Sequence, residues 1–246
     1  MIRTTPGIIL FAGCLLLAFS SAHAESVQIP LYHASYTVSR NDLQIGVAEF
    51  SLIRNPDGSY SYKSVTQPTG LAALFFSDII TESSQFTVED GKPESLRYDY
   101  TNSNNSHDDA EHIQFDWSRQ IADCHDGKRH KILKIEPGIH DRALAQLAVS
   151  LDLAAGRLAD AYRVLDHNQI TSYRMEREPD EKLKTQNWAY QTVKVARKDA
   201  KKKRTTTFWL VPELHYLPAQ IEQTEPGKAT ITLTMTEIKF DITNSK

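Results

Sequence analysis

The chain has 246 residues, 40% of them hydrophobic and 24% charged, and its net charge at pH 7 is −3. A chain of this length can bury a sizeable core. Its small net charge argues against a dedicated nucleic-acid binder, so we expect no nucleic acid among its partners.

Residues 1–24 have the features of a secretory signal peptide. A charged start at Arg3 precedes a mostly apolar run of about 14 residues, from Pro6 to Phe19, and the cleavage-site pattern Ala22-His23-Ala24 follows it. The run is shorter than the roughly 18 to 20 residues that cross a bilayer. We predict cleavage after Ala24, a periplasmic location, and a single domain over residues 25–246.

The chain has two cysteines, Cys14 and Cys124. Cys14 resembles the lipidated cysteine of a lipoprotein, but it lies inside the apolar run rather than at its end, which argues against lipidation. Cleavage would remove Cys14 and one base, Arg3, which changes the net charge from −3 to −4. Only Cys124 would remain, and we expect it to be an unreactive thiol in a strand.

Most of the chain after residue 30 alternates between apolar and polar residues, as half-buried strands do. The segments with this alternation are 31–38, 46–54, 59–67, 84–90, 94–100, 110–117, 120–125, 130–136, 159–166, 170–177, 187–197, 205–212, 217–225 and 229–240. Turn sequences such as Asn55-Pro56-Asp57-Gly58, Asp126-Gly127 and Pro226-Gly227 separate several of them. We therefore expect consecutive antiparallel hairpins.

Residues 141–155 break this alternation and predict a helix. Asp141 is a suitable N-cap and Gly156 a suitable terminator. The apolar residues recur at helical spacing and form one face. They are Leu144, Leu147, Ala148, Leu151, Ala154 and Ala155.

Together these elements predict a mainly β protein. An open sheet of about a dozen strands tends to curl because of its twist. We expect one large curled antiparallel sheet, a half-barrel or open barrel, with one main helix packed against it.

Several short motifs resemble the uncharacterised bacterial family called domain of unknown function 3108. They are Gly46-Val47-Ala48-Glu49, Phe115-Asp116-Trp117, Asp141 opening the helix, Tyr162-Arg163-Val164-Leu165-Asp166, Phe208-Trp209-Leu210 and Tyr216-Leu217-Pro218-Ala219. In strand order the chain is also similar to the periplasmic lipoprotein-localisation carriers, a likeness of fold alone. That second resemblance implies an acyl chain held between a curved sheet and a helix.

Residues 70–80 form an unusually apolar segment between two predicted strands. The candidate ligand-binding or lid residues are Leu71, Leu74, Phe75, Phe76, Ile79 and Ile80. A short helix has one face to bury, so these side chains must divide between two environments. Three interpretations stay open: the segment fills the mouth of the sheet and packs under the helix, it is a lid over an apolar pocket, or it docks on a membrane.

Residues 197–204 are strongly basic. This run lies between two strands, where a solvated hairpin tip is the simplest interpretation. Clustered cations also attract anionic lipid headgroups or an acidic partner, at about 1 kcal/mol each near a charged surface. The candidate contacts are Lys201, Lys202, Lys203 and Arg204.

We expect neither a metal nor a cofactor, because no residue pattern commits to one. His107 and His112 are five residues apart, so they diverge on a helix and point to opposite faces on a strand. His125 and His130 have the same spacing, although a hairpin at Asp126-Gly127 would bring them together, and an adventitious metal site there stays open as an alternative. The chain contains no nucleophile elbow, phosphate-binding loop or dinucleotide-binding fingerprint.

From the sequence we predict a non-enzymatic carrier of an apolar small molecule or lipid, with the ligand inside the sheet. The main alternative is an envelope interaction module whose interior is filled by its own side chains. A hydrolase acting on an envelope polymer is a weaker third possibility. Another envelope protein or an anionic membrane surface is the expected macromolecular partner.

Overall fold

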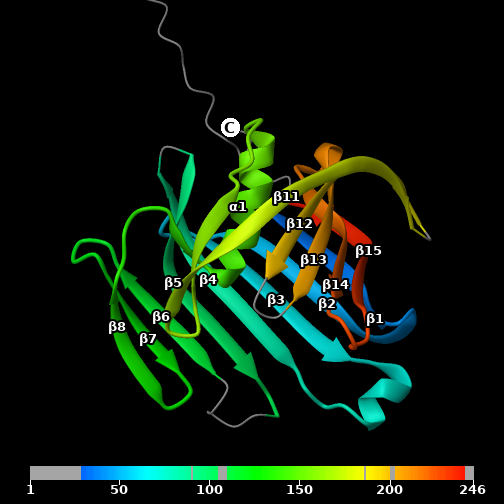
Figure 1. The fold of residues 1–246 in the computed structure, drawn as a ribbon, viewed down its shortest axis with the longest axis horizontal. Helices are drawn as coiled ribbons and strands as arrows, with labels where there is room; N and C mark the ends of the chain where they lie inside the picture. The colour runs from blue at the N-terminus through cyan, green and yellow to red at the C-terminus, as the bar shows by residue number, and fades with distance from the viewer. Residues whose placement is uncertain (1–28, 90, 105–109, 186, 200–202, 242–246) are drawn as a thin grey trace, which may run out of the picture.

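The computed structural model describes residues 29–89, 91–104, 110–185, 187–199 and 203–241 (Figure 1). The strands are β1 (Tyr32–Arg40), β2 (Leu43–Arg54), β3 (Tyr60–Pro68), β4 (Ile80–Glu89), β5 (Lys92–Asn102), β6 (Glu111–Asp116), β7 (Ile121–Asp126), β8 (Arg129–Lys134), β9 (Ile139–Asp141), β10 (Ala161–Asp166), β11 (Gln169–Lys184), β12 (Ala189–Asp199), β13 (Arg204–Val211), β14 (Leu217–Thr224) and β15 (Ile231–Phe240). The helices are α1 (Arg142–Ala154) and two short 3₁₀ turns, η1 (Gly70–Leu74) and η2 (Pro212–Leu214).

All the described strands belong to one 15-stranded sheet, in the order β8-β7-β6-β5-β4-β3-β2-β1-β15-β14-β13-β12-β11-β10-β9. The first and last strands therefore pair near the middle of the sheet. β8 and β9 are its two edges, so the sheet does not close into a barrel. The predicted fold class, a curled antiparallel sheet forming an open barrel with one main helix, is confirmed.

Three details differ from the prediction. β9 is short and pairs with β10 in parallel, with α1 as the crossover between them. β4 begins at Ile80, several residues earlier than the alternation indicates. β11 continues through the polar stretch after Glu178, where the register shifts between Glu178 and Glu181. A bulge of this kind tolerates Pro179, which has no N–H to donate to a ladder.

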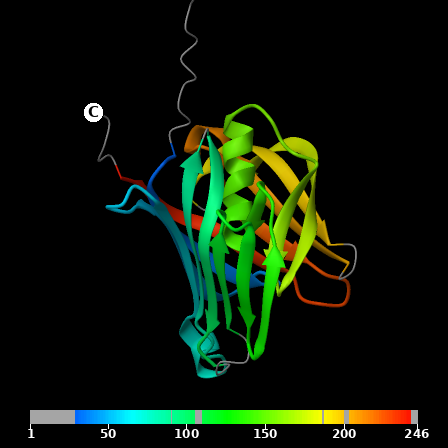
Figure 2. The same ribbon diagram turned by 90° about the vertical axis from the view of Figure 1, so that its left-hand side faces the viewer.

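α1 is the predicted helix and starts at the predicted cap. The Asp141 side chain accepts a 2.8 Å hydrogen bond from the Leu144 backbone N–H. Gly156 ends the helical stretch with a φ of +72°, a conformation that glycine adopts without strain. The helix lies on the concave side of the sheet, which curves around it (Figure 2).

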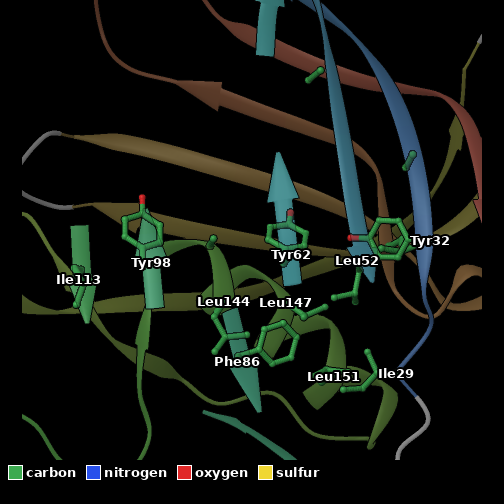
Figure 3. Packing of buried hydrophobic residues seen from close by; sticks show 14 of the residues in the cluster. Ile29, Tyr32, Leu52, Tyr62, Phe86, Tyr98, Ile113, Leu144, Leu147 and Leu151 are labelled. Carbon is green, nitrogen blue, oxygen red and sulfur yellow. The ribbon is translucent and has the colours of Figure 1, made fainter. Parts of the chain in front are cut away.

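Both flanks of α1 are buried, whereas the sequence pattern predicted one apolar face. Leu144, Leu147 and Leu151 pack against strands of the first half of the chain, including Phe86 and Leu52 (Figure 3). The other flank packs into a second cluster from the later strands. Its helical members are Ala145, Ala148, Val149 and Leu153. Ala154 and Ala155, which were predicted to be on the buried stripe, are exposed.

The curl brings distant parts of the chain together. The turn between β10 and β11 contacts β8, where the Lys131 ammonium donates to the Asn168 carbonyl and the Asn168 amide donates to the Arg129 carbonyl. Among the described residues, none of the helices combines the length and the hydropathy that crossing a bilayer requires.

Candidate functional site

The apolar segment 70–80 projects away from the core. η1 begins after Thr69, whose backbone N–H donates to the Ile45 carbonyl at 3.1 Å, so the segment is anchored beside β2. Figures 1 and 2 both place η1 at the end of the sheet far from α1. The exposed fractions are 80% for Leu71, 76% for Leu74, 81% for Phe75, 49% for Phe76 and 41% for Ile79, and Ile80 is partly buried.

This geometry overturns one of the three interpretations. The segment neither fills the interior of the sheet nor packs under α1, because most of its large apolar side chains are exposed. The sequence pattern misleads here because it counts apolar side chains without showing which of them have a surface to cover. A role in binding a ligand or another surface stays open.

Phe76 lines an open groove of about 460 Å³, which we call the turn-end groove. Its lining residues come from the ends of β1, β2, β13, β14 and β15, from the turn that joins the last two strands, and from the segment 70–80. They are Arg40, Ile45, Phe76, Arg204, Gln223, Glu225, Gly227, Lys228, Ala229 and Ile231. The volume falls within the range of about 300 to 1,000 Å³ typical of small-molecule sites.

Strand register explains why these residues meet. Ile231 pairs with Arg40 on one side and with Gln223 on the other. The two neighbouring turns are tied together, because the Asn41 N–H donates to the Thr230 carbonyl and the Thr230 N–H donates to the Asn41 side chain. The floor of the groove is therefore formed by strand ends and turns that hydrogen bonds hold together.

The root of the segment is also closely packed. A Cβ atom added at Gly46 would lie 2.5 Å from the Gln67 carbonyl oxygen, so only glycine fits between β2 and β3 at this position. Gly46 adjoins Ile45, which lines the groove and holds Thr69. Gly46 therefore sets how closely the start of η1 approaches the sheet.

The groove carries an excess of positive charge. The Glu225 carboxylate accepts hydrogen bonds from Lys228 at 2.7 Å and from Arg204 at 3.2 Å. These hydrogen bonds lower the pKa of the Glu225 carboxyl, and the bond from Lys228 has the largest effect. Arg40 forms no ion pair within the described part of the chain. Three cations and one carboxylate therefore face apolar Ile45, Phe76 and Ile231.

Of the predicted basic contacts, Arg204 lies in the groove. Lys203 is an exposed turn residue with a φ of +50°. Lys201 and Lys202 lie outside the described residues. The sequence thus proposed Phe76 and Arg204 separately, and the structure brings them together.

Among the described residues, α1 fills much of the space inside the curl where the ligand was expected. A cavity beside the helix, lined in part by Arg142, Val149 and Phe208, has a volume of only about 10 Å³. That is about the room for one water molecule. The cavity at this position has no room for an acyl chain.

The polar groups near the start of α1 form a network of ion pairs around Arg142. The Arg142 guanidinium donates to Glu82 at 2.9 Å and to Asp166 at 3.1 Å, and lies 3.9 Å from Glu111. Burial raises the pKa of the Glu111 carboxyl, while the charge of Arg142 opposes this shift. Arg142 is the cation that these three carboxylates share, which is the arrangement of a structural ion-pair network.

Asp141 and His140, at the junction of β9 and α1, are both buried. Burial raises the pKa of Asp141 to about 6, against hydrogen bonds from Ser84 and Ser95. Burial lowers the pKa of His140 to about 4. In both groups burial favours the uncharged form of the side chain.

The remaining predicted candidates lie on or under β6, β7 and β8. Cys124 is buried, and burial raises the pKa of its thiol to about 12, which agrees with an unreactive cysteine. His125 points to the other face and stacks on His130 with ring centroids 4.3 Å apart, as the hairpin predicted. His112 is exposed on β6, and His107 lies outside the described residues.

The comparisons with known proteins identify the family. The sequence profile described as "Protein of unknown function (DUF3108)" matches residues 32–236. The chain belongs to this family. The family expected from the motifs is thus confirmed. The match runs from β1 into β15 and includes all the residues that line the turn-end groove.

Two solved structures align with this chain, and one of them has a similar fold. A β-barrel-like protein of domain of unknown function DUF1849 from Brucella abortus is similar with a TM-score of 0.56 at 9% identity, covering 87% of this chain and 99% of that one. MucB in complex with MucA(peri) aligns at 8% identity over 89% of this chain and 96% of that one, but its TM-score of 0.18 is too low to support an argument. The search of curated proteins gives no match.

Sequence reasoning missed most of the groove. Arg40, Ile45, Lys228 and Ile231 carry no motif, and they become neighbours only because β1 pairs with β15. The one usable signal was the turn at Pro226-Gly227, whose flanking basic and acidic residues were visible. Pairing between the two ends of a chain cannot be deduced from alternation alone.

Proposed function

We propose that this DUF3108 protein is an exported, non-enzymatic binder of an anionic amphiphile, a small molecule with an acyl-like tail and an acidic head. The observation that carries the proposal is the turn-end groove, where cations and apolar side chains line the same 460 Å³. Apolar walls with a few placed polar groups are the usual composition of a ligand site. Arg40, which no carboxylate neutralises within the described residues, suits the acidic head.

The apolar part of the ligand would cover Phe76, Ile45 and Ile231. Covering apolar surface stabilises a complex by roughly 25 cal/mol per Å². Phe76 is the only member of the segment 70–80 among the groove residues and is half-exposed, so it has surface left to bury. Export is supported by the signal-peptide pattern of residues 1–24, and intact mass of the purified protein tests it by the predicted start at Glu25.

A titration with a fluorescent fatty acid tests the binding proposal. Phe76→Ser and Arg40→Gln should each weaken binding several-fold, since each removes one kind of contact. Ile132→Ser and Lys134→Gln, on the edge strand β8, are the matched apolar and basic controls and should bind like wild type. Absence of saturable binding by wild type, or equal binding by all four variants, would remove the proposal.

A second candidate is the interaction module, favoured by the 76–81% exposure of Leu71, Leu74 and Phe75. Three large apolar side chains on one short turn are expensive to leave in water and are typical of a docking surface. Sedimentation with vesicles of anionic lipid would test one such surface. This candidate would be favoured over the first if wild type bound no fatty acid but bound the vesicles, and if a variant with Leu71→Ser, Leu74→Ser and Phe75→Ser lost vesicle binding.

A further inference from the structure

Three histidines and two aspartates gather on the outer face of β5 to β8. Register places Asp99 opposite His112, His112 opposite His125, and His125 opposite His130, so these side chains form a row across four neighbouring strands. The Nδ1 atom of His112 lies 2.7 Å from Oδ1 of Asp99, within hydrogen-bond distance. Asp123 precedes His125 by two residues and shares its face of β7.

Within this row, three side chains direct their donor atoms to one point. The Nε2 atom of His130 lies 2.8 Å from Asp123 Oδ1, and that of His125 lies 3.2 Å from the same oxygen. Ligand atoms of Asp123, His125 and His130 all lie within 4.8 Å of one another. Two imidazoles therefore share one carboxylate oxygen.

This donor set suits a borderline transition metal. Zn²⁺ takes imidazole nitrogen at about 2.0–2.1 Å and carboxylate oxygen at similar distances, in tetrahedral sites that place ligands about 3.3 Å apart. The distance from Asp123 to His125, 3.2 Å, is close to that value, and the distance to His130, 2.8 Å, is shorter. Mg²⁺ and Ca²⁺ prefer all-oxygen sites, so two imidazoles argue against them.

A second cluster of possible metal ligands is less suited to a metal ion, because an arginine already lies beside it. Glu111, Asp166 and His167 also come within 4.8 Å of one another. There the Arg142 guanidinium lies 3.1 Å from Asp166 and 3.9 Å from Glu111, so a cation already occupies the position. No arginine or lysine forms a recorded ion pair with Asp123 within the described residues.

We propose that Asp123, His125 and His130 form a surface Zn²⁺ site. The two rings are now nearly parallel, with 14° between their planes, so they must turn about their Cβ–Cγ bonds for both nitrogens to reach one ion. Their side-chain exposures of 53% and 52% allow this movement. Three protein ligands leave a coordination position open to water or another molecule. This proposal revises the expectation, made from the sequence, that the chain holds no metal.

The site would also fasten the edge of the sheet. His130 is on β8, which is an edge strand, and His125 is on β7. A metal that bridges the two strands would restrain β8, whose backbone otherwise pairs on one side only. Slower amide exchange in β8 on adding Zn²⁺ is the expected consequence.

Equilibrium dialysis of tag-free protein against ZnCl₂, with the bound metal measured by mass spectrometry, tests the proposal. Wild type should bind one Zn²⁺ per chain, and His125→Ala, His130→Ala and Asp123→Ala should each lower the affinity at least tenfold. His33→Ala is the matched control, because His33 is an exposed histidine 4.0 Å from Asp241 on another part of the sheet. It should bind like wild type.

The melting temperature without metal separates binding from folding. All four variants replace surface side chains and should melt like wild type in chelator, whereas added Zn²⁺ should stabilise only wild type and His33→Ala. Absence of saturable Zn²⁺ binding by wild type would overturn the proposal. Equal affinities for wild type and the three ligand variants would overturn it too, because binding would then be adventitious.

Discussion

Phe76 and Arg204 line the same groove, although one follows η1 and the other begins β13. Each belongs to a separate candidate set from the sequence, one apolar and one basic. Their meeting turns two unrelated surface features into one site with an apolar wall and a charged rim. The predictions below test the packing that creates this site and the fold that carries it.

Serine substitutions in the segment 70–80 should leave stability nearly unchanged. Leu74 and Phe75 are 76% and 81% exposed, so Leu74→Ser and Phe75→Ser remove little buried surface, and surface changes usually stay within about 0.5 kcal/mol. Denaturant unfolding measures this. Losses of about 3 to 5 kcal/mol, which large-to-small changes cause in a packed core, would show that the segment is buried in solution.

Gly46→Ala should destabilise the protein by about 1 to 3 kcal/mol. The new methyl group would lie 2.5 Å from the Gln67 carbonyl oxygen, and relief of this clash requires β2 and β3 to separate. The free energy of unfolding checks this expectation. Gly58→Ala provides a contrast, because nothing lies within 4 Å of its added Cβ and only its φ of +87° opposes alanine. A Gly46→Ala protein as stable as wild type would contradict the packing at this position.

Leu147→Asp should destabilise by more than about 3 kcal/mol. Leu147 is 5% exposed and packs in the cluster that also contains Leu144 and Phe86, so an ionised side chain there would lose its hydration without gaining a partner. Gln146→Asp is a control on the same helix at a partly exposed position. Equal stabilities of the two variants would show that α1 is not held in the core.

His140 and Asp141 should make opposite contributions to stability as the pH falls from 7 to 5. The folded pKa of His140 is about 4 rather than 6.5, so below pH 6.5 the unfolded chain gains a proton that the native state lacks, and stability falls. The folded pKa of Asp141 is about 6 rather than 3.8, so the native state gains the proton first, and stability rises. One pKa unit corresponds to about 1.4 kcal/mol, so each effect is on the order of 1 to 2 kcal/mol in this interval.

Variants separate the two contributions. Between pH 7 and pH 5, His140→Phe should gain stability relative to wild type, and Asp141→Asn should lose stability relative to wild type. Asparagine keeps the N-cap acceptor for Leu144, which limits other effects. Urea unfolding at the two pH values measures both differences. Identical pH dependence in all three proteins would mean that neither group is buried as described.

The fold was predictable from the sequence to the extent that local patterns determine it. Alternation and turn residues located most strands, and Asp141 and Gly156 marked both ends of α1. The short β9 was missed because three residues cannot show an alternation. The extension of β11 was missed because its residues after Glu178 are mostly exposed and polar.

The candidate site was less predictable because it depends on long-range pairing. The sequence showed that residues 70–80 are apolar but gave no indication that they lie outside the core. Both flanks of α1 pack against the sheet, and the cavity beside this helix, of about 10 Å³, is too small for the ligand that the curled sheet suggested. His125 and His130 were the exception, since one hairpin suffices to pair them.

Methyl NMR during titration with dodecanoate, below its micelle concentration, tests the central claim most directly. The account predicts saturable shifts at Ile45 and Ile231, which line the turn-end groove, and unchanged signals at Leu147 and Val149 of α1. Ile132, exposed on β8, is the control for non-specific contact. Shifts centred on Leu147 and Val149, with Ile45 and Ile231 unchanged, would place the ligand inside the sheet and contradict the account.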